Sequence, residues 1–220
     1  MKPSSRGAAR AVGAALQAVS NPLPEMVDVV FDLSATILPD GYEWPLYQAI
    51  AKRASWMADS PYSGIHPIRG TRSSGGILFV AKRAKLAIRM PRDRVCAASI
   101  LEGAVLDLGA ATVRLGQGTF RRFRPAPTLY AARVTTGEAD EGAFSERVGA
   151  ELDALDIPRL FLCGRRADVM FEDRLQAAFS VAVHGLSDPQ SLLLQRAGLG
   201  IARAVGCGVF VPHKTIVSTE

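Results

Sequence analysis

The chain has 220 residues, 48% hydrophobic and 21% charged, a balance that excludes both a largely disordered protein and a small disulfide-stapled one. Lysine and arginine outnumber aspartate and glutamate by 26 to 21, and the resulting net charge of +5 favours a polyanionic partner without identifying it. All but five of these cations are arginines, whose planar guanidinium group suits phosphate.

The cysteines and the apolar runs bear on compartment and cofactors. Cys96, Cys163 and Cys207 are widely spaced and form no CxxC or Cys/His pair, so we expect neither a disulfide framework nor a zinc site, and no cofactor. No apolar run reaches the roughly 18 residues of a membrane span. We therefore expect a cytoplasmic protein with no membrane partner.

The first 25 residues differ in composition from the rest of the chain. They are rich in alanine, serine and arginine and contain no acidic residue before Glu25. A strand pattern begins at Met26, directly after the segment Asn-Pro-Leu-Pro. We interpret residues 1–25 as an N-terminal extension, which is either a short helical tail or a segment upstream of a natural start at Met26.

From residue 26 on, the spacing of apolar residues switches between the period of strands and that of helices, and the same order of elements occurs twice. In the first half it predicts a strand over 27–34, a helix over 42–57, two strands within 76–91, a helix over 92–108, and a strand or hairpin over 111–125. In the second half it predicts a strand over 128–136, a helix over 141–157, strands over 159–166 and 177–187, a helix over 188–200, and a strand over 207–217.

This order is β-α-β-β-α-β in each half, the order of the split βαβ unit. The sequence therefore predicts an α+β protein made of two tandem ferredoxin-like (RRM-like) domains, 26–125 and 127–220, separated at Pro125-Ala126-Pro127. Four-stranded sheets of this kind serve as RNA-recognition platforms, although they also serve unrelated tasks, and the clustered Phe/Tyr signature of RNA-binding strands is missing here.

The most specific motif is a glycine-rich loop over residues 198–208. It holds two Gly-x-Gly pairs, Gly198/Gly200 and Gly206/Gly208, with Arg203 between them. Glycine allows positive φ and close approach of backbone N–H groups, so such a loop can cradle phosphate oxygens; the alternative is a tight connection whose glycines serve packing alone. Dinucleotide and Walker loops follow a strand and need further βα units, so a nucleotide-binding regulator is disfavoured.

Residues 198–208 match, position by position, the C-terminal glycine-rich loop of a known family. The chain resembles the CRISPR-associated endoribonucleases that cut repeat RNA into guide RNAs, the Cas-six family, over about residue 27 to its end. The segments GIHPIRG (64–70), TLYA (128–131) and CGRR (163–166) and the run ending at Lys214 look like the myxobacterial-type branch. The resemblance implies two ferredoxin-like halves, a CRISPR repeat stem-loop as substrate, and delivery to a Cascade-type effector complex.

Metal-independent cleavage of RNA uses the ribose 2′-OH and leaves a 2′,3′-cyclic phosphate and a 5′-OH, so it needs a base, an acid and cations. His66 follows the first helix, at the point where the family commonly places its catalytic histidine, and we assign it that role. Arg69 and Arg72 follow in the same cationic loop. The family often adds a tyrosine and a lysine; Tyr47 and Arg72 are our candidates for these positions, with Tyr62 as another.

The chain has two other histidines. His213, beside the glycine-rich loop, is our second choice for the catalytic histidine or a phosphate contact. His184, at the end of an apolar strand, is expected to be structural and hydrogen-bonded.

The expected RNA-binding surface consists of the glycine-rich loop and several arginine and lysine clusters, which hold a stem-loop mainly through its phosphates. Its members are Gly198, Gly200, Arg203, Gly206, Gly208, His213, Lys214, Lys82, Arg83, Arg121, Arg122, Arg124, Arg165 and Arg166. The plainer alternative for each cluster is a solvated charge run. A non-catalytic RNA-binding subunit of an effector complex is the main alternative to an enzyme.

Overall fold

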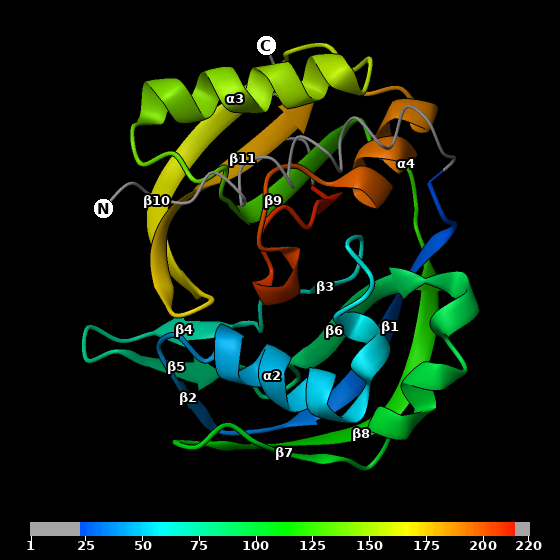
Figure 1. The fold of residues 1–220 in the computed structure, drawn as a ribbon, viewed down its shortest axis with the longest axis vertical. Coiled ribbons are helices and arrows are strands. Elements are labelled where there is room, and N and C mark those ends of the chain that lie inside the picture. The colour runs from blue at the N-terminus through cyan, green and yellow to red at the C-terminus, as the bar shows by residue number, and fades with distance from the viewer. Residues whose placement is uncertain (1–22, 214–220) are drawn as a thin grey trace.

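The computed structural model describes residues 23–213, and Figure 1 shows their arrangement in two stacked halves. The elements of the N-terminal half lie within residues 26–122, and those of the C-terminal half lie within residues 128–212. Both helices and sheets contribute, which agrees with the predicted α+β class. Residues 1–22 of the predicted extension over 1–25 lie outside the described residues. Lys214, a predicted RNA contact, also lies outside them.

An antiparallel sheet in the order β3-β6-β1-β8-β7 forms the centre of the N-terminal half. Its strands are β1 (Met26–Ser34), β3 (Gly64–Ile65), β6 (Lys85–Pro91), β7 (Val105–Asp107) and β8 (Thr112–Arg122). Alternation in β1 buries Val27, Val29 and Phe31 in the same core as Leu46 and Ile50 of α2 (Glu43–Arg53). The residues between them, Asp28 among them, therefore lie on the opposite face of the sheet.

A second, smaller sheet accounts for one departure from the predicted topology. Strands β2 (Ile37–Pro39), β5 (Ile77–Val80) and β4 (Gly70–Arg72) pair in the order β2-β5-β4. The two strands predicted within 76–91 both form, but β5 joins this small sheet while β6 joins the large one. The 3₁₀ helix η1 (Ser55–Met57) follows α2 directly.

The helix predicted over 92–108 is wrong. This segment forms two 3₁₀ helices, η2 (Arg92–Arg94) and η3 (Ala97–Leu101), followed by β7. The buried residues of η3 are Ala98 and Leu101, a spacing of three that fits three residues per turn. Gly103 adopts φ +69° and turns the chain into β7, so the segment lacks the length of a regular helix.

The C-terminal half has the strand order β10-β11-β9-β12, which is the spatial order of a split βαβ unit. Its elements are β9 (Thr128–Val134), α3 (Glu141–Ala154), β10 (Phe161–Phe171), β11 (Arg174–His184), α4 (Asp188–Ala197) and β12 (Val211–Pro212). Asp140 caps α3 by accepting a bond from the backbone N–H of Ala143, and Ser187 with Gln190 forms a capping box at α4.

Each half has its own hydrophobic core, and a third cluster packs between them. The first core lies within residues 27–115 and the second within 129–210. The third joins Val205 and Cys207 of the glycine-rich loop to Trp44 of α2, whose ring meets that of Phe171 at 5.4 Å. None of the helices in the described part of the chain is long and apolar enough to cross a membrane.

Candidate functional site

His66 lies directly after β3, and its imidazole Nε2 is 3.1 Å from Oδ1 of Asp28 on β1. The backbone N–H of His66 donates to Ala87 O of β6 at 2.9 Å, so the residue continues the edge of the sheet. Two residues further on, Ile68 N–H donates to the buried hydroxyl of Tyr42 at 2.9 Å. The loop that carries the histidine is therefore fixed on both sides.

Three side chains in register across the sheet make the surroundings of His66. Asp28 of β1 pairs with Arg89 of β6 on one side and with Arg121 of β8 on the other. Because directly opposed residues of antiparallel strands share a face, these side chains form a polar row on the face turned away from α2. Sequence reasoning missed Asp28 and Arg89, because their pairing depends on strand register.

Arg89 is completely buried and has a partner for every part of its guanidinium group. Its Nε and Nη2 donate to Asp28 at 2.9 and 3.2 Å, and its Nη1 donates to the carbonyls of Gln195 and Phe210 at 2.8 and 2.9 Å. The ring of Phe123 lies 4.4 Å from its Cζ. Since the two carbonyls belong to the C-terminal half, Arg89 ties the polar row to that half.

The electrostatics of the pair follow from burial and these neighbours. Burial lowers the pKa of His66 below its usual value, with Arg89 and Arg203 acting in the same direction and Asp28 in the opposite one. The pKa of Asp28 is lowered: burial acts to raise it, but His66 and Arg89 together outweigh that effect. The ground state is thus a neutral imidazole beside a carboxylate, which suits proton transfer near neutral pH.

A groove of about 800 Å³ opens beside this row, between the two halves. Its lining residues are Asp28, Arg89, Phe120, Arg121, Arg122, Phe123, Arg124, Gln195, Val211 and Pro212. The predicted cluster Arg121, Arg122 and Arg124 is exposed along this groove. The groove therefore combines exposed cations, aromatic rings and the carboxylate that contacts His66.

The other predicted cation clusters lie elsewhere. Lys82 and Arg83 occupy the turn before β6, at the opposite end of that strand from Arg89. Arg165 and Arg166 lie on β10, the edge strand farthest from the β12 wall of the groove. The expected continuous surface is therefore divided into three separate exposed patches, of which one lines the groove.

The glycine-rich loop is packed inward, and this corrects the expected open phosphate cradle. A Cβ at Gly206 would lie 2.7 Å from Ile65 O, and one at Gly64 would lie 2.9 Å from Arg203 O. The positions beside Gly198, Gly200 and Gly208 are likewise filled by backbone carbonyls of this chain. Contact of these glycines with RNA stays a prediction, and it would require the loop to move.

Arg203 is also buried, with only 7% of its surface exposed. Its Nη1 donates to the carbonyls of Arg196 and Ala197 at the end of α4. Within the described residues its Nε and Nη2 have no hydrogen-bond partner, and burial lowers the pKa of its guanidinium group. Tyr62, which precedes His66 by four residues, acts electrostatically to raise the pKa of the Arg203 guanidinium group, against the effect of burial.

Two residues proposed to assist His66 are engaged elsewhere. Arg72 on β4 pairs with Asp40 and, at 3.0 Å, with Glu43. Tyr47 stacks on Trp44 at 5.3 Å between ring centroids. The cations that act on His66 are Arg89 and Arg203. Arg69 remains exposed in the loop after His66, as expected of a phosphate contact.

The remaining histidines are both exposed. His213 follows β12, and its ring lies 5.4 Å from that of Tyr130. His184 ends β11, where its backbone N–H bonds to Leu160 O. The side chain of His184 faces solvent, so a structural role for its imidazole stays a prediction.

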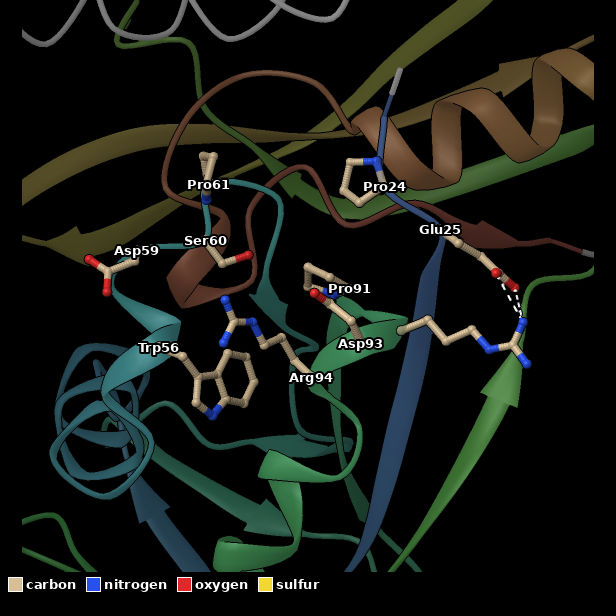
Figure 2. A pocket seen from close by; sticks show the side chains of 10 residues that line it. Pro24, Glu25, Trp56, Asp59, Ser60, Pro61, Pro91, Asp93 and Arg94 are labelled. Atoms are coloured by element: carbon tan, nitrogen blue, oxygen red, sulfur yellow. Dashed lines mark hydrogen bonds and ion pairs between the residues drawn. The ribbon is translucent and has the colours of Figure 1, made fainter. Parts of the chain in front are cut away.

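A second hollow, of about 660 Å³, lies in the N-terminal half (Figure 2). Its lining residues are Pro24, Glu25, Trp56, Asp59, Ser60, Pro61, Pro91, Arg92, Asp93 and Arg94. Carboxylates balance the arginines here, and Glu25 pairs with Arg92 across the rim. A polyanion is better accommodated in the groove between the halves, where exposed arginines dominate.

Comparison with known proteins adds an independent observation. The family model described as Cas6 Crispr matches residues 27–215. The chain belongs to the Cas6 family. It is 28% identical over 187 residues to the CRISPR-associated endonuclease Cas6 of Myxococcus xanthus strain DK1622, covering 84% of this chain and 81% of that protein. The resemblance stated from the sequence is thereby confirmed.

Two solved structures share the fold. A RAMP protein described as binding different RNA substrates superposes with a TM-score of 0.65 at 14% identity, covering 86% of this chain and all of that one. A protein characterised from a Cas6-related gene of Pyrococcus furiosus gives a TM-score of 0.59 at 13% identity, covering 88% and 100%. At these identities the likeness concerns architecture alone.

Proposed function

We propose that this chain is a metal-independent endoribonuclease that cuts CRISPR precursor RNA within its repeats, in the cytoplasm. The observation that carries the proposal is the placement of His66 against Asp28, at a groove between the halves lined by Arg121, Arg122 and Arg124. The name of the Myxococcus xanthus relative, an endonuclease, supports the same activity. Both halves are interpreted as variants of the ferredoxin-like unit, the N-terminal one with a shortened second helix.

The reaction exchanges one phosphorus–oxygen bond for another. The ribose 2′-oxygen attacks the adjacent phosphorus, the bond from phosphorus to the 5′ oxygen breaks, and the products are a 2′,3′-cyclic phosphate and a 5′-OH. His66, neutral because of its burial, takes the proton of the 2′-OH and then releases it to water, and water supplies the proton that the departing 5′ oxygen takes up. Arg69, three residues after His66, and Arg121, the register partner of Asp28 on β8, are exposed cations suited to the charge that develops on phosphate.

The RNA is held mainly through its phosphates. A-form RNA hides its base edges in a narrow major groove, so exposed arginines track its backbone without reading sequence. Arg121, Arg122 and Arg124 form the central contact in this proposal, and the patches at Lys82/Arg83 and Arg165/Arg166 extend it toward flanking RNA. The product then stays bound and passes to a Cascade-type effector complex.

The test is cleavage of a labelled CRISPR repeat RNA in EDTA. We expect one cut, a cyclic phosphate on the upstream product, and no reaction when the scissile ribose is 2′-deoxy. His66→Ala is expected to lower the rate by about 10²- to 10⁴-fold while repeat binding persists. His213→Ala and His184→Ala serve as matched histidine controls.

The outcomes separate the competing functions. Binding without a cut by the unaltered protein identifies a non-catalytic RNA-binding subunit. Loss of cleavage in His213→Ala with normal cleavage in His66→Ala transfers the catalytic role to His213.

A further inference from the structure

Asp28 lies where a carboxylate can fix one face of the catalytic imidazole. Its Oδ1 is 3.1 Å from Nε2 of His66, and the side chains are 17% and 15% exposed, respectively. Within the described residues, Nε2 of His66 is buried and has no hydrogen-bond partner, so its contact with Asp28 is a close approach and not a formed hydrogen bond. Catalytic hydrogen bonds commonly tighten only when substrate is bound.

Asp28 is itself held rigidly. Arg89 binds both carboxylate oxygens, and the same guanidinium group donates to Gln195 O and Phe210 O of the C-terminal half. Arg89 is 0% exposed, and a charged group buried this deeply is confined to the geometry that satisfies it. The carboxylate therefore has one orientation, set by how the two halves meet.

We propose that Asp28 is the positioning residue for His66 in the cleavage reaction, an inference that rests on the proposed function. Asp28 accepts from the protonated Nε2, and because a neutral imidazole has one donor and one acceptor nitrogen, Nδ1 is the atom that takes the 2′-OH proton. The imidazolium that forms is stabilised by the adjacent carboxylate, as in triads of unrelated hydrolases. Arg89 makes this placement depend on the contact between the halves.

The charges around His66 decide what removal of the carboxylate does. Asp28 on β1 favours the imidazolium, whereas Arg89 on β6 and Arg203 of the glycine-rich loop oppose it. With Asp28 replaced by asparagine, only the opposing charges remain. His66 then becomes a weaker base, and the acidic limb of the pH–rate profile moves to lower pH.

The experiment compares Asp28→Asn with Asp32→Asn, a second aspartate of β1 that pairs with Lys85 at the surface. We expect Asp28→Asn to lower single-turnover cleavage at saturating RNA by about 10- to 100-fold, with unchanged affinity for a 2′-deoxy repeat. Asp32→Asn is expected to cleave like the unaltered protein. In ¹⁵N NMR of the unaltered protein, His66 should be protonated on Nε2, and its pKa should fall in Asp28→Asn.

Two results would overturn the inference: an Nδ1-protonated imidazole in the unaltered protein, or an Asp28→Asn variant with normal cleavage and normal His66 pKa. The NMR readouts need no RNA, so they decide the positioning role even if the unaltered protein cuts nothing, which would refute the proposed function instead. If Asp28→Asn does not fold, the protonation state in the unaltered protein alone decides.

Discussion

Glu43 accepts a 2.6 Å hydrogen bond from Nη1 of Arg133, and this buried ion pair joins α2 of the N-terminal half to β9 of the C-terminal half. Arg72 binds the same carboxylate oxygen at 3.0 Å. Among the described residues, Arg133 and Arg89 are buried arginines whose guanidinium groups donate across the junction between the halves. Because the candidate site lies at that junction, its geometry depends on both.

Glu43→Gln should destabilise the protein by about 3 kcal/mol, since it leaves Arg133 buried without its counterion. The matched change Glu25→Gln removes an exposed pair with Arg92 and should cost no more than about 1 kcal/mol. Urea unfolding of both variants measures the difference. Equal losses would mean that the buried pair does not hold the halves together.

Gly206→Ala should disturb the loop that carries His66. Gly206 has φ +87°, and an added Cβ would meet Ile65 O at 2.7 Å, one residue before the histidine. Gly137→Ala is the control, because Gly137 has φ +90° and open space around it. We expect about 1–2 kcal/mol of destabilisation for Gly137→Ala, from backbone strain alone.

For Gly206→Ala the clash adds to the strain, giving about 3 kcal/mol in total and slower cleavage per folded molecule. Unfolding curves and single-turnover cleavage of repeat RNA give the two measurements. If both alanine variants behave alike, the inward packing of the loop has no part in placing His66.

Replacing Arg121 and Arg122 by alanine should weaken repeat binding and reduce its salt dependence. Each lost phosphate contact lowers the slope of log affinity against log salt by about 1. Replacing Arg165 and Arg166 should have a smaller effect, because β10 lies across the sheet from the groove. Affinities for the repeat, measured over a salt series, show which of the two double variants binds more weakly. A larger loss on replacing Arg165 and Arg166 would place the RNA on the C-terminal sheet.

Stability should fall in alkaline solution partly because of Cys207. Burial raises the pKa of its thiol from 9.0 to about 12, so between these values the unfolded chain loses a proton that the folded chain keeps. The contribution of the Cys207 thiol to the free energy of unfolding is fully present below pH 9. As the pH rises above 9, that contribution is lost at about 1.4 kcal/mol per pH unit.

Cys207→Ala should make the stability curve between pH 9 and 12 less steep by that amount, whatever its effect at pH 8. Denaturant unfolding under reducing conditions at several pH values measures the slope. The comparison removes the contributions of other groups, which both proteins share. Identical slopes would show that the thiol titrates normally.

The spacing of apolar residues predicted most helices and strands, but it failed over one segment. The alternation in β1 identified a strand with one buried face, and the apolar pattern of 42–57 identified α2 and η1. The sequence over 92–108 predicts one helix, whereas the structure has η2, η3 and β7 there. Separating a helix from these shorter elements requires knowledge of what the segment packs against.

His66 was identified from its loop and from the family resemblance, whereas Asp28 and Arg89 were missed. Their only sequence signal is a charged residue inside a strand-like apolar run, which places it on the face away from the core. That these two side chains meet, and meet His66, is decided by antiparallel register between segments about sixty residues apart. The glycines were expected to allow close approach, and backbone carbonyls of this chain do approach them closely, while their contact with phosphate stays a prediction.

The inward packing of the glycine-rich loop ties the chain segment of His66 to the C-terminal half. Gly206 lies against Ile65 of β3, and Gly200 and Ile201 lie against Thr135, directly after β9. A substitution at these glycines would therefore shift the segment of His66 even if the loop never touches RNA. The packing of the fold alone restricts which residues can occupy these positions.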